Sequence, residues 1–214
     1  MDRKFKNLAH IVFEKIYYYL IMSLMYVVSI IAGLVFLTFG GSHVLLYKLN
    51  DKLSHERYKE KIKVFKFFKK NFISFTKKYI KVSILYVSLI LILAVDIFYF
   101  STSISPIFTA LFYLILILSF IIINAIELSF LLMAKYSEMT FRDVAQNSIS
   151  LIIVNIVDVL FLDAIVALVA IVIYKISDIL LIILFPGIFI ELSYYVFNKM
   201  LEKKSLTYLL FNIK

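Results

Sequence analysis

Five long runs of apolar residues follow one another along the chain, and shorter polar segments separate them. Each run is long enough to cross the hydrocarbon core of a bilayer as a helix, which takes about 20 residues. The first run follows a basic tail and is too long for the apolar region of a signal peptide, so we expect it to be retained. The pattern predicts an all-α, polytopic membrane helical bundle that forms one domain over residues 1–214. The expected spans are 16–39, 82–100, 107–132, 149–174 and 179–198.

Segment 58–81, between the first two runs, has a different pattern. Aromatic and aliphatic residues recur there every three or four positions, and lysines fill the positions between them, which indicates an amphipathic helix. Such a helix is typical of one that lies in the headgroup plane of an anionic inner leaflet. Docking to a cytoplasmic or membrane partner is the alternative. The residues of this candidate surface are Lys61, Phe65, Lys66, Phe68, Lys70, Phe72, Phe75, Lys77 and Lys78.

Composition supports a lipid environment. Of the 214 residues, 63% are hydrophobic and 17% are charged, and the mean hydropathy is +0.98. A soluble domain has roughly 45–50% apolar and about 25% charged residues. The net charge of +9 would favour nucleic acid as the partner of a soluble protein. Because lipid would cover the aromatic stripe of the amphipathic segment, we expect a bilayer with an anionic inner leaflet as the partner instead, and no nucleic acid.

The basic residues predict how the spans are oriented, because positive charge is concentrated in cytoplasmic loops. Twelve of the 23 Lys and Arg residues lie in segment 40–81. With five spans and this segment inside, 18 basic residues lie inside and five outside, which predicts an external N-terminus and a cytoplasmic C-terminus. In the alternative, residues 11–47 form a re-entrant or hairpin element that bends at Gly33 or at Gly40 and Gly41. That arrangement places 22 basic residues inside and one outside.

Several polar residues lie inside the expected spans or near their ends. A charged side chain at the bilayer centre costs roughly 2.5–3.5 kcal/mol, so these groups should face the bundle interior. One hypothesis is a polar or proton-linked path lined by Asp158, Asn155 and Glu127. The other is that the groups only join helices through hydrogen bonds. The candidates are Asp96, Asn124, Glu127, Asn155, Asp158, Asp163 and Glu191.

The sequence offers no recognisable catalytic motif. Cysteine is absent, which excludes thiolate zinc sites and Fe–S clusters, and the three histidines are widely spaced. No nucleophile elbow, H-E-x-x-H or phosphate-binding loop occurs. We therefore expect no enzyme activity, no cofactor and no metal site.

The order of these features resembles the YesL-like family of small bacterial membrane proteins, a family named as a domain of unknown function. The resemblance covers roughly residues 10–204. In place of the proline and small residues that members often have after the first span, this chain has Gly40 and Gly41. The matching segments are FLTFGGSHVLLYKL, KVFKFFKKNFISFTKKYIK, LAVDIFYF, KYSEMTFRDVAQNSISLIIVN and FPGIFIELSYYVFNKMLEKK.

Members of that family tend to be encoded beside carbohydrate ABC importers. The resemblance therefore implies a non-enzymatic accessory subunit in the bacterial plasma membrane, packed against the permease helices of such an importer. The alternative is a stand-alone small transporter or proton-linked carrier that uses the intramembrane carboxylates. Against the alternative, the chain has no evident internal repeat of the kind that many carriers have.

Overall fold

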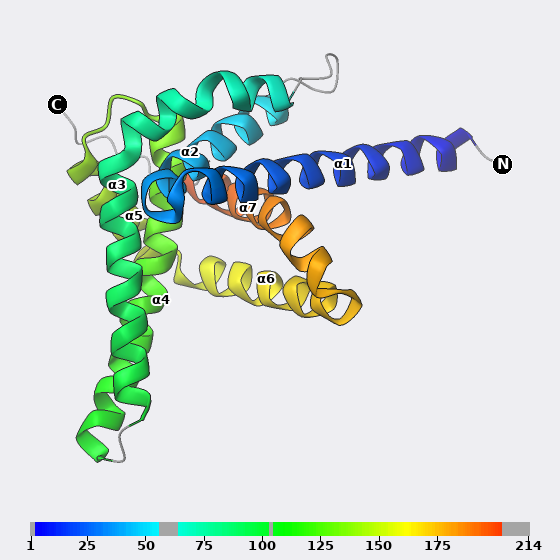
Figure 1. Ribbon diagram of the computed structural model, residues 1–214. Coiled ribbons are helices and arrows are strands. Elements are labelled where there is room, and N and C mark those ends of the chain that lie inside the picture. The colour runs from blue at the N-terminus through cyan, green and yellow to red at the C-terminus, as the bar shows by residue number, and fades with distance from the viewer. Residues whose placement is uncertain (1–2, 56–63, 103–104, 203–214) are drawn as a thin grey trace.

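The computed structural model describes residues 3–55, 64–102 and 105–202, which form an all-α fold (Figure 1). Four of the helices, α3, α4, α6 and α7, are long and apolar enough to cross a membrane. The prediction of a membrane helical bundle is thereby confirmed. The helices of the described residues are α1 (Arg3–Ala32), α2 (Leu34–His55), α3 (Val64–Ser101), α4 (Pro106–Lys135), α5 (Phe141–Val154), α6 (Ile156–Ile176) and α7 (Asp178–Glu202).

The first expected span, 16–39, is not one helix. Helix α1 ends at Ala32, and Leu34 begins α2 with a left-handed φ of 56°. A Cβ on Gly33 would lie 1.8 Å from Thr38 Cγ2, so a larger residue at this position would have to displace the Thr38 side chain. The continuous apolar part of α1, Lys15–Ile31, is shorter than the four candidate spans. The prediction of a single helix over 16–39 is therefore wrong, and the bend lies at Gly33, as in the hairpin alternative.

After this bend, α2 folds back along α1. The hydroxyl oxygens of Ser29 and Ser42 are 2.8 Å apart, and Tyr26 contacts His43, so the two helices form an antiparallel hairpin. Most of α2 lies in the core, and its fully buried residues include Val44, Leu45, Leu46, Tyr47 and Leu49. Segment 40–55 is therefore the central packing element of the protein. The cytoplasmic assignment of segment 40–81 stays a prediction, because packing between helices does not place a segment on either side of a membrane.

The fourth expected span, 149–174, is divided between α5 and α6 at Asn155. The Asn155 side-chain amide donates to the Leu151 carbonyl oxygen (3.0 Å), and an amide that bonds to the backbone in this way competes with regular helix. Helix α5 has its own start signal, because Thr140 and Asp143 form a capping box. The expected helix over 149–174 is thus replaced by a short α5 and an apolar α6.

Helix α3 joins two elements that the sequence analysis separated. It runs without interruption from the amphipathic segment, of which 58–63 lie outside the described residues, through the second expected span, 82–100. In Figure 1 it lies along the top of the molecule and then turns down beside α4. Its upper half packs closely on α2, where a Cβ on Gly41 would lie 2.8 Å from Thr76 Cα. Small residues permit this close approach of two helix backbones.

Helix α7 packs on α1 around Pro186. A proline inside a helix removes a backbone hydrogen bond, and neighbouring groups must compensate. Next to the proline, the Ser23 hydroxyl of α1 donates to the Leu184 carbonyl oxygen (3.2 Å) and accepts from the Gly187 amide (2.7 Å), and so it bonds to two backbone groups that flank Pro186. A Cβ on Gly187 would lie 2.5 Å from the Tyr19 carbonyl oxygen, so glycine is required for this approach.

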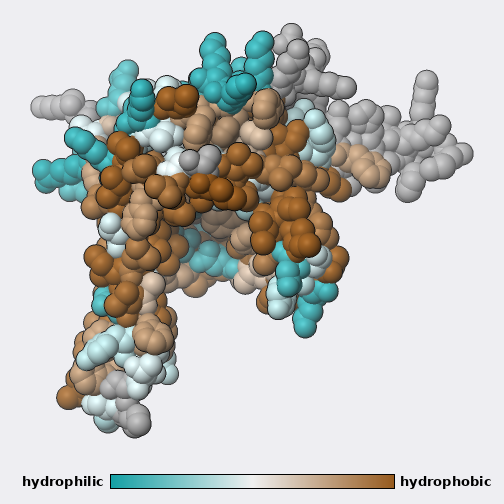
Figure 2. Space-filling view, in the orientation of Figure 1, coloured by the Kyte–Doolittle hydropathy of each residue, from teal (hydrophilic) through white to brown (hydrophobic). Residues whose placement is uncertain are grey.

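The lower half of α3 and the first half of α4 project from the body as a helical hairpin, which we call the α3–α4 arm (residues 84–118; Figures 1 and 2). Its surface in Figure 2 is mostly apolar and ends in a paler, more polar tip. Large apolar side chains are exposed along the arm, among them Val95 (64%), Phe98 (73%) and Ile107 (72%). The fold thus leaves a large apolar surface for lipid or for another protein.

Candidate functional site

A buried carboxylate marks the polar centre of the bundle. Glu127 lies on α4 and is 8% exposed. The Tyr47 hydroxyl donates to Glu127 Oε1 at 2.6 Å, and His43 Nε2 lies 3.7 Å from Oε2. His43 and Tyr47 are four residues apart and therefore lie on one face of α2. A hydrogen bond of this length to a carboxylate is of the strong, charge-assisted kind.

The ring of His43 is held on all sides by aromatic groups. It stacks on Phe130 (centroids 4.8 Å, 25° between planes) and contacts Phe39 and Tyr26. Its Nδ1 lies 2.9 Å from the Phe39 carbonyl oxygen, and because a carbonyl only accepts, Nδ1 carries a proton. Nε2 then faces both the Tyr26 hydroxyl, at 3.3 Å, and Glu127. It accepts a hydrogen bond in the neutral ring and forms an ion pair in the imidazolium.

Tyr47 acts as a neutral donor in this cluster. It lies on α2, which is not among the four candidate spans, and its side chain is fully buried. Desolvation by burial, together with the nearby Glu127 carboxyl group, raises the pKa of the Tyr47 phenol well above its usual value. The arrangement of Glu127, His43, Tyr47 and Tyr26, which we call the Glu127 cluster, places a carboxyl group beside an imidazole in the buried centre of the bundle.

A second polar group joins α2 and α4 to α7, nearer to the C-terminal ends of these helices. Asp51 on α2 accepts from the Tyr194 hydroxyl of α7 (2.7 Å) and lies 3.6 Å from the Lys135 ammonium of α4. Lys135 also donates to Asn198 and lies over the Tyr194 ring, 5.4 Å from its centroid. Asp51 is 34% exposed in this pair, so water reaches the group. Its arrangement is that of a structural junction.

The predicted polar residues separate into several places. Asn124 donates to Asp163 (3.0 Å) and so joins α4 to α6, whereas Glu127, one turn later on the same helix, faces α2. Glu191 forms a long, partly exposed ion pair with Lys15 (3.9 Å). Asp96 is partly exposed on the α3–α4 arm.

Asn155 and Asp158 lie at the junction of α5 and α6, and Asn155 is buried there. The Asn155 side-chain amide donates to the Leu151 carbonyl oxygen of its own helix, whereas Glu127 contacts Tyr47 and His43 of α2. Among the seven predicted polar residues, the contacts described above join one pair, Asn124 and Asp163. The path from Asp158 through Asn155 to Glu127 stays a prediction.

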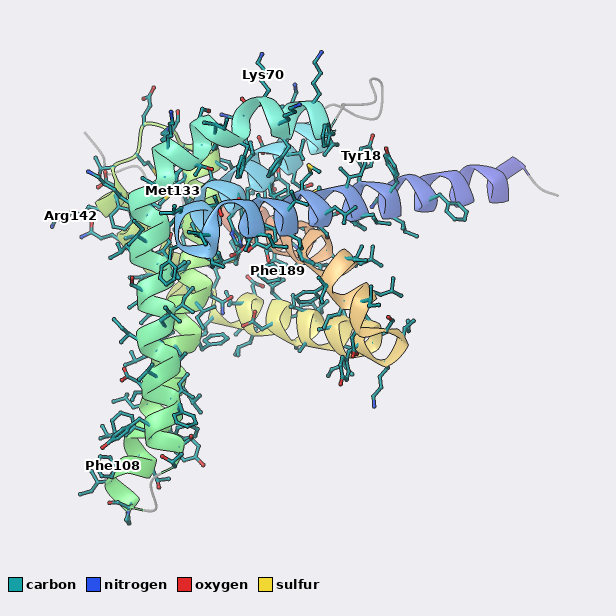
Figure 3. The ribbon with its side chains drawn as sticks, viewed as in Figure 1. Tyr18, Lys70, Phe108, Met133, Arg142 and Phe189 are labelled. Carbon is teal, nitrogen blue, oxygen red and sulfur yellow. The ribbon has the colours of Figure 1, made fainter. Side chains whose placement is uncertain are left out.

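The candidate membrane-surface residues also separate. Phe68 is buried in the core and Phe72 and Phe75 pack against it, while Phe65 is 57% exposed. The aromatic stripe therefore meets mainly the protein's own helices, whereas Lys70 points outward at the top of Figure 3. Lys61 lies outside the described residues. The exposed lysines of this candidate surface are Lys66, Lys70, Lys77 and Lys78.

The sequence analysis missed three members of the Glu127 cluster. Tyr26 lay within a uniform apolar run, and His43 and Tyr47 lay in a segment assigned to the cytoplasm. One signal in the sequence could have identified His43 and Tyr47. They are four residues apart in segment 34–49, which is otherwise apolar except for a few small polar residues and Lys48.

No group of three or more His, Cys, Asp or Glu residues that could hold a metal ion occurs in the part of the chain that the structure describes. Fold and site together define a multi-pass membrane helical protein with a buried ionisable cluster. No family model, curated protein or solved structure matches this chain.

Proposed function

We propose that this protein is a non-enzymatic accessory subunit of a bacterial ABC-type carbohydrate importer and that its α3–α4 arm packs against the permease helices. The observation that carries the proposal is the exposure of the arm. In the most apolar 18-residue stretches of α3 and α4, 17% and 6% of the residues are buried. The resemblance to the YesL-like family supplies the class of partner.

The arm has the pattern of an interface surface. Ile92, Val95 and Tyr99 follow at helical spacing on α3 and are between 57% and 64% exposed. Contiguous apolar surface of this kind meets lipid or another protein. A two-helix arm that is long enough to cross a membrane would present both helices to the side of a permease.

The partner is tested by crosslinking from the arm in cells. Photoreactive phenylalanine replaces Phe98, which is 73% exposed on the arm, and in a matched control it replaces Phe65, which is 57% exposed on the upper half of α3. We expect position 98, and not position 65, to crosslink to an integral permease subunit that co-purifies with a sugar-binding protein in mild detergent. Crosslinks from position 98 to lipid alone would contradict the proposal.

We propose a plasma-membrane location with both ends of the chain in the cytoplasm. The part of the chain that the structure describes contains four candidate spans, an even number, and the bend at Gly33 supports the arrangement that leaves one basic residue, Lys175, outside. The chain has no cysteine, so single cysteines at Lys15, Lys175 and Lys199 can be labelled without background. An impermeant thiol reagent added to intact cells should label only position 175. Labelling at position 15 would instead favour the external N-terminus.

A second candidate function is a proton-linked carrier, and the Glu127 cluster favours it. Carboxylates and histidines inside membrane proteins commonly mark proton relays. Purified protein in liposomes with a pH-sensitive dye would test this function. Proton-coupled flux that Glu127→Gln abolishes would support a carrier, and wild-type flux equal to that of empty liposomes would exclude it.

A further inference from the structure

A groove lies where the base of the α3–α4 arm meets α5. Its volume is about 420 Å³, which falls in the range of roughly 300–1,000 Å³ typical of small-molecule sites. Helix α3 contributes Leu85, Leu89 and Ile92, and α5 contributes Phe141 and Ile149. Residues of α4 form the third wall. The groove is therefore built from two candidate membrane spans and the short helix that follows them.

The lining offers a ligand almost nothing but carbon. Nine of the twelve lining residues are apolar, and the other three, Tyr86, Ser88 and Ser148, carry one hydroxyl each. The Ser148 hydroxyl donates to the Val144 carbonyl oxygen of its own helix (2.7 Å), so its hydrogen is not offered to the groove. A polar or charged molecule would lose its hydration here without gaining partners. The occupant that fits is a hydrocarbon chain.

The groove opens onto the outer surface of the arm. Leu85, Ile92 and Ile149 line it and are still 50%, 57% and 43% exposed. A lipid chain from the surrounding bilayer thus reaches the groove sideways, without leaving an apolar environment.

The upper end of the groove is basic. The rings of Tyr86 and Phe141 lie 5.9 Å apart and mark this end. Exposed Lys81 lies one helical turn before Leu85 on α3, and exposed Arg142 follows Phe141 at the start of α5, on the left of Figure 3.

The nearest acid in sequence is directed elsewhere. The Asp143 carboxylate accepts from the backbone amide and the hydroxyl of Thr140 in the capping box. A headgroup at this end therefore meets two cations, of which the guanidinium of Arg142 suits a phosphate.

We infer that this groove is a binding site for an anionic glycerophospholipid, with one acyl chain between α3, α4 and α5 and the phosphate headgroup between Lys81 and Arg142. The inference does not rest on the proposed importer partner. It does place a bound lipid at the base of the arm that carries the partner surface.

The site is tested with phosphatidylglycerol that carries a photoreactive group on its acyl chain, in nanodiscs that contain the full chain. We expect the label at groove residues of α3 and α5 and a stronger competition by unlabelled phosphatidylglycerol than by phosphatidylcholine. Ala145→Phe fills the groove and should remove this label, whereas Ala164→Phe, on an exposed position of α6, should retain it.

Charge variants test the headgroup without altering the core. Lys81→Gln and Arg142→Gln should each weaken retention of phosphatidylglycerol by about fivefold, the contribution of one basic residue near an anionic surface, and Lys175→Gln should not. Equal labelling of α6 and the groove, or an unchanged label in Ala145→Phe that folds normally, would show an unspecific lipid shell and overturn the inference. If Ala145→Phe does not fold, the charge variants decide the question, because a lack of preference for the anionic lipid would overturn the inference as well.

Discussion

Replacing Tyr47 by phenylalanine removes a single oxygen from the centre of the Glu127 cluster. The ring stays in its fully buried site, so packing is preserved and the 2.6 Å hydrogen bond to Glu127 is lost. A hydrogen bond to a charged group contributes about 1.5–3 kcal/mol, and no water can replace the hydroxyl in this packed position. We expect Tyr47→Phe to lower the free energy of unfolding by that amount.

The measurement is reversible unfolding of the purified protein in mixed micelles, in which increasing dodecyl sulfate unfolds the helices and circular dichroism follows their loss. Tyr113→Phe is the matched control, because Tyr113 is 60% exposed on α4. It loses the same atom at the surface, and its effect should stay within about 0.5 kcal/mol.

Measuring Tyr47→Phe a second time, in a Glu127→Leu variant, separates the effect of the hydrogen bond from the effect of burying the tyrosine. In Glu127→Leu the carboxylate acceptor is absent, so the Tyr47 hydroxyl becomes a buried donor without that partner. Removing it there should cost nothing or stabilise the protein, because an unsatisfied buried polar group is itself unfavourable by about 1–3 kcal/mol. If Tyr47→Phe destabilised both backgrounds equally, the hydrogen bond to Glu127 would not be the source of its effect.

Three further substitutions test other parts of the fold. Gly41→Ala should cost about 1–3 kcal/mol in the same unfolding assay, because its Cβ would meet the Thr76 backbone, and an unchanged stability would contradict the close α2–α3 packing. Thr140→Ala removes the capping box of α5 and should cost about 0.5–2 kcal/mol, measurable as faster hydrogen exchange in the first turn of α5 but not of α6. Lys135→Met should cost only about 1 kcal/mol, because water screens Asp51; a loss of several kcal/mol would show that this junction is effectively buried.

The apolar runs predicted the helices well but not where they break. A helix is the simplest structure that satisfies its own backbone groups in lipid, so long apolar runs with few charges are read correctly as spans. Breaks depend on local contacts that such uniform runs do not record. At the bend between α1 and α2, Gly33 has no Cβ and so leaves room for the Thr38 side chain. At the end of α5, the Asn155 side-chain amide donates to the Leu151 carbonyl oxygen.

The candidate site was half predictable for a related reason. An acid in an apolar run must be buried among partners or snorkel, so Glu127 could be singled out from the sequence alone. Its partners could not, because the many lysines of segment 40–81 suggested a cytoplasmic location for His43 and Tyr47. The lysines that follow α2 do not determine the position of its first half, which the hairpin turn at Gly33 brings back into the bundle.

Helix α4 joins the two parts of the molecule that serve different purposes. Its second half supplies an unbroken buried stretch from Asn124 to Met133, including Glu127, whereas its first half is largely exposed on the arm. Helix α3 is divided in the reverse order, with its first half on α2 and its second half on the arm. Most of the packing free energy therefore resides above the arm. Substitutions such as those at Phe98 should change the surface of the arm without unfolding the bundle, while Tyr47→Phe should weaken the bundle and leave the surface of the arm unchanged.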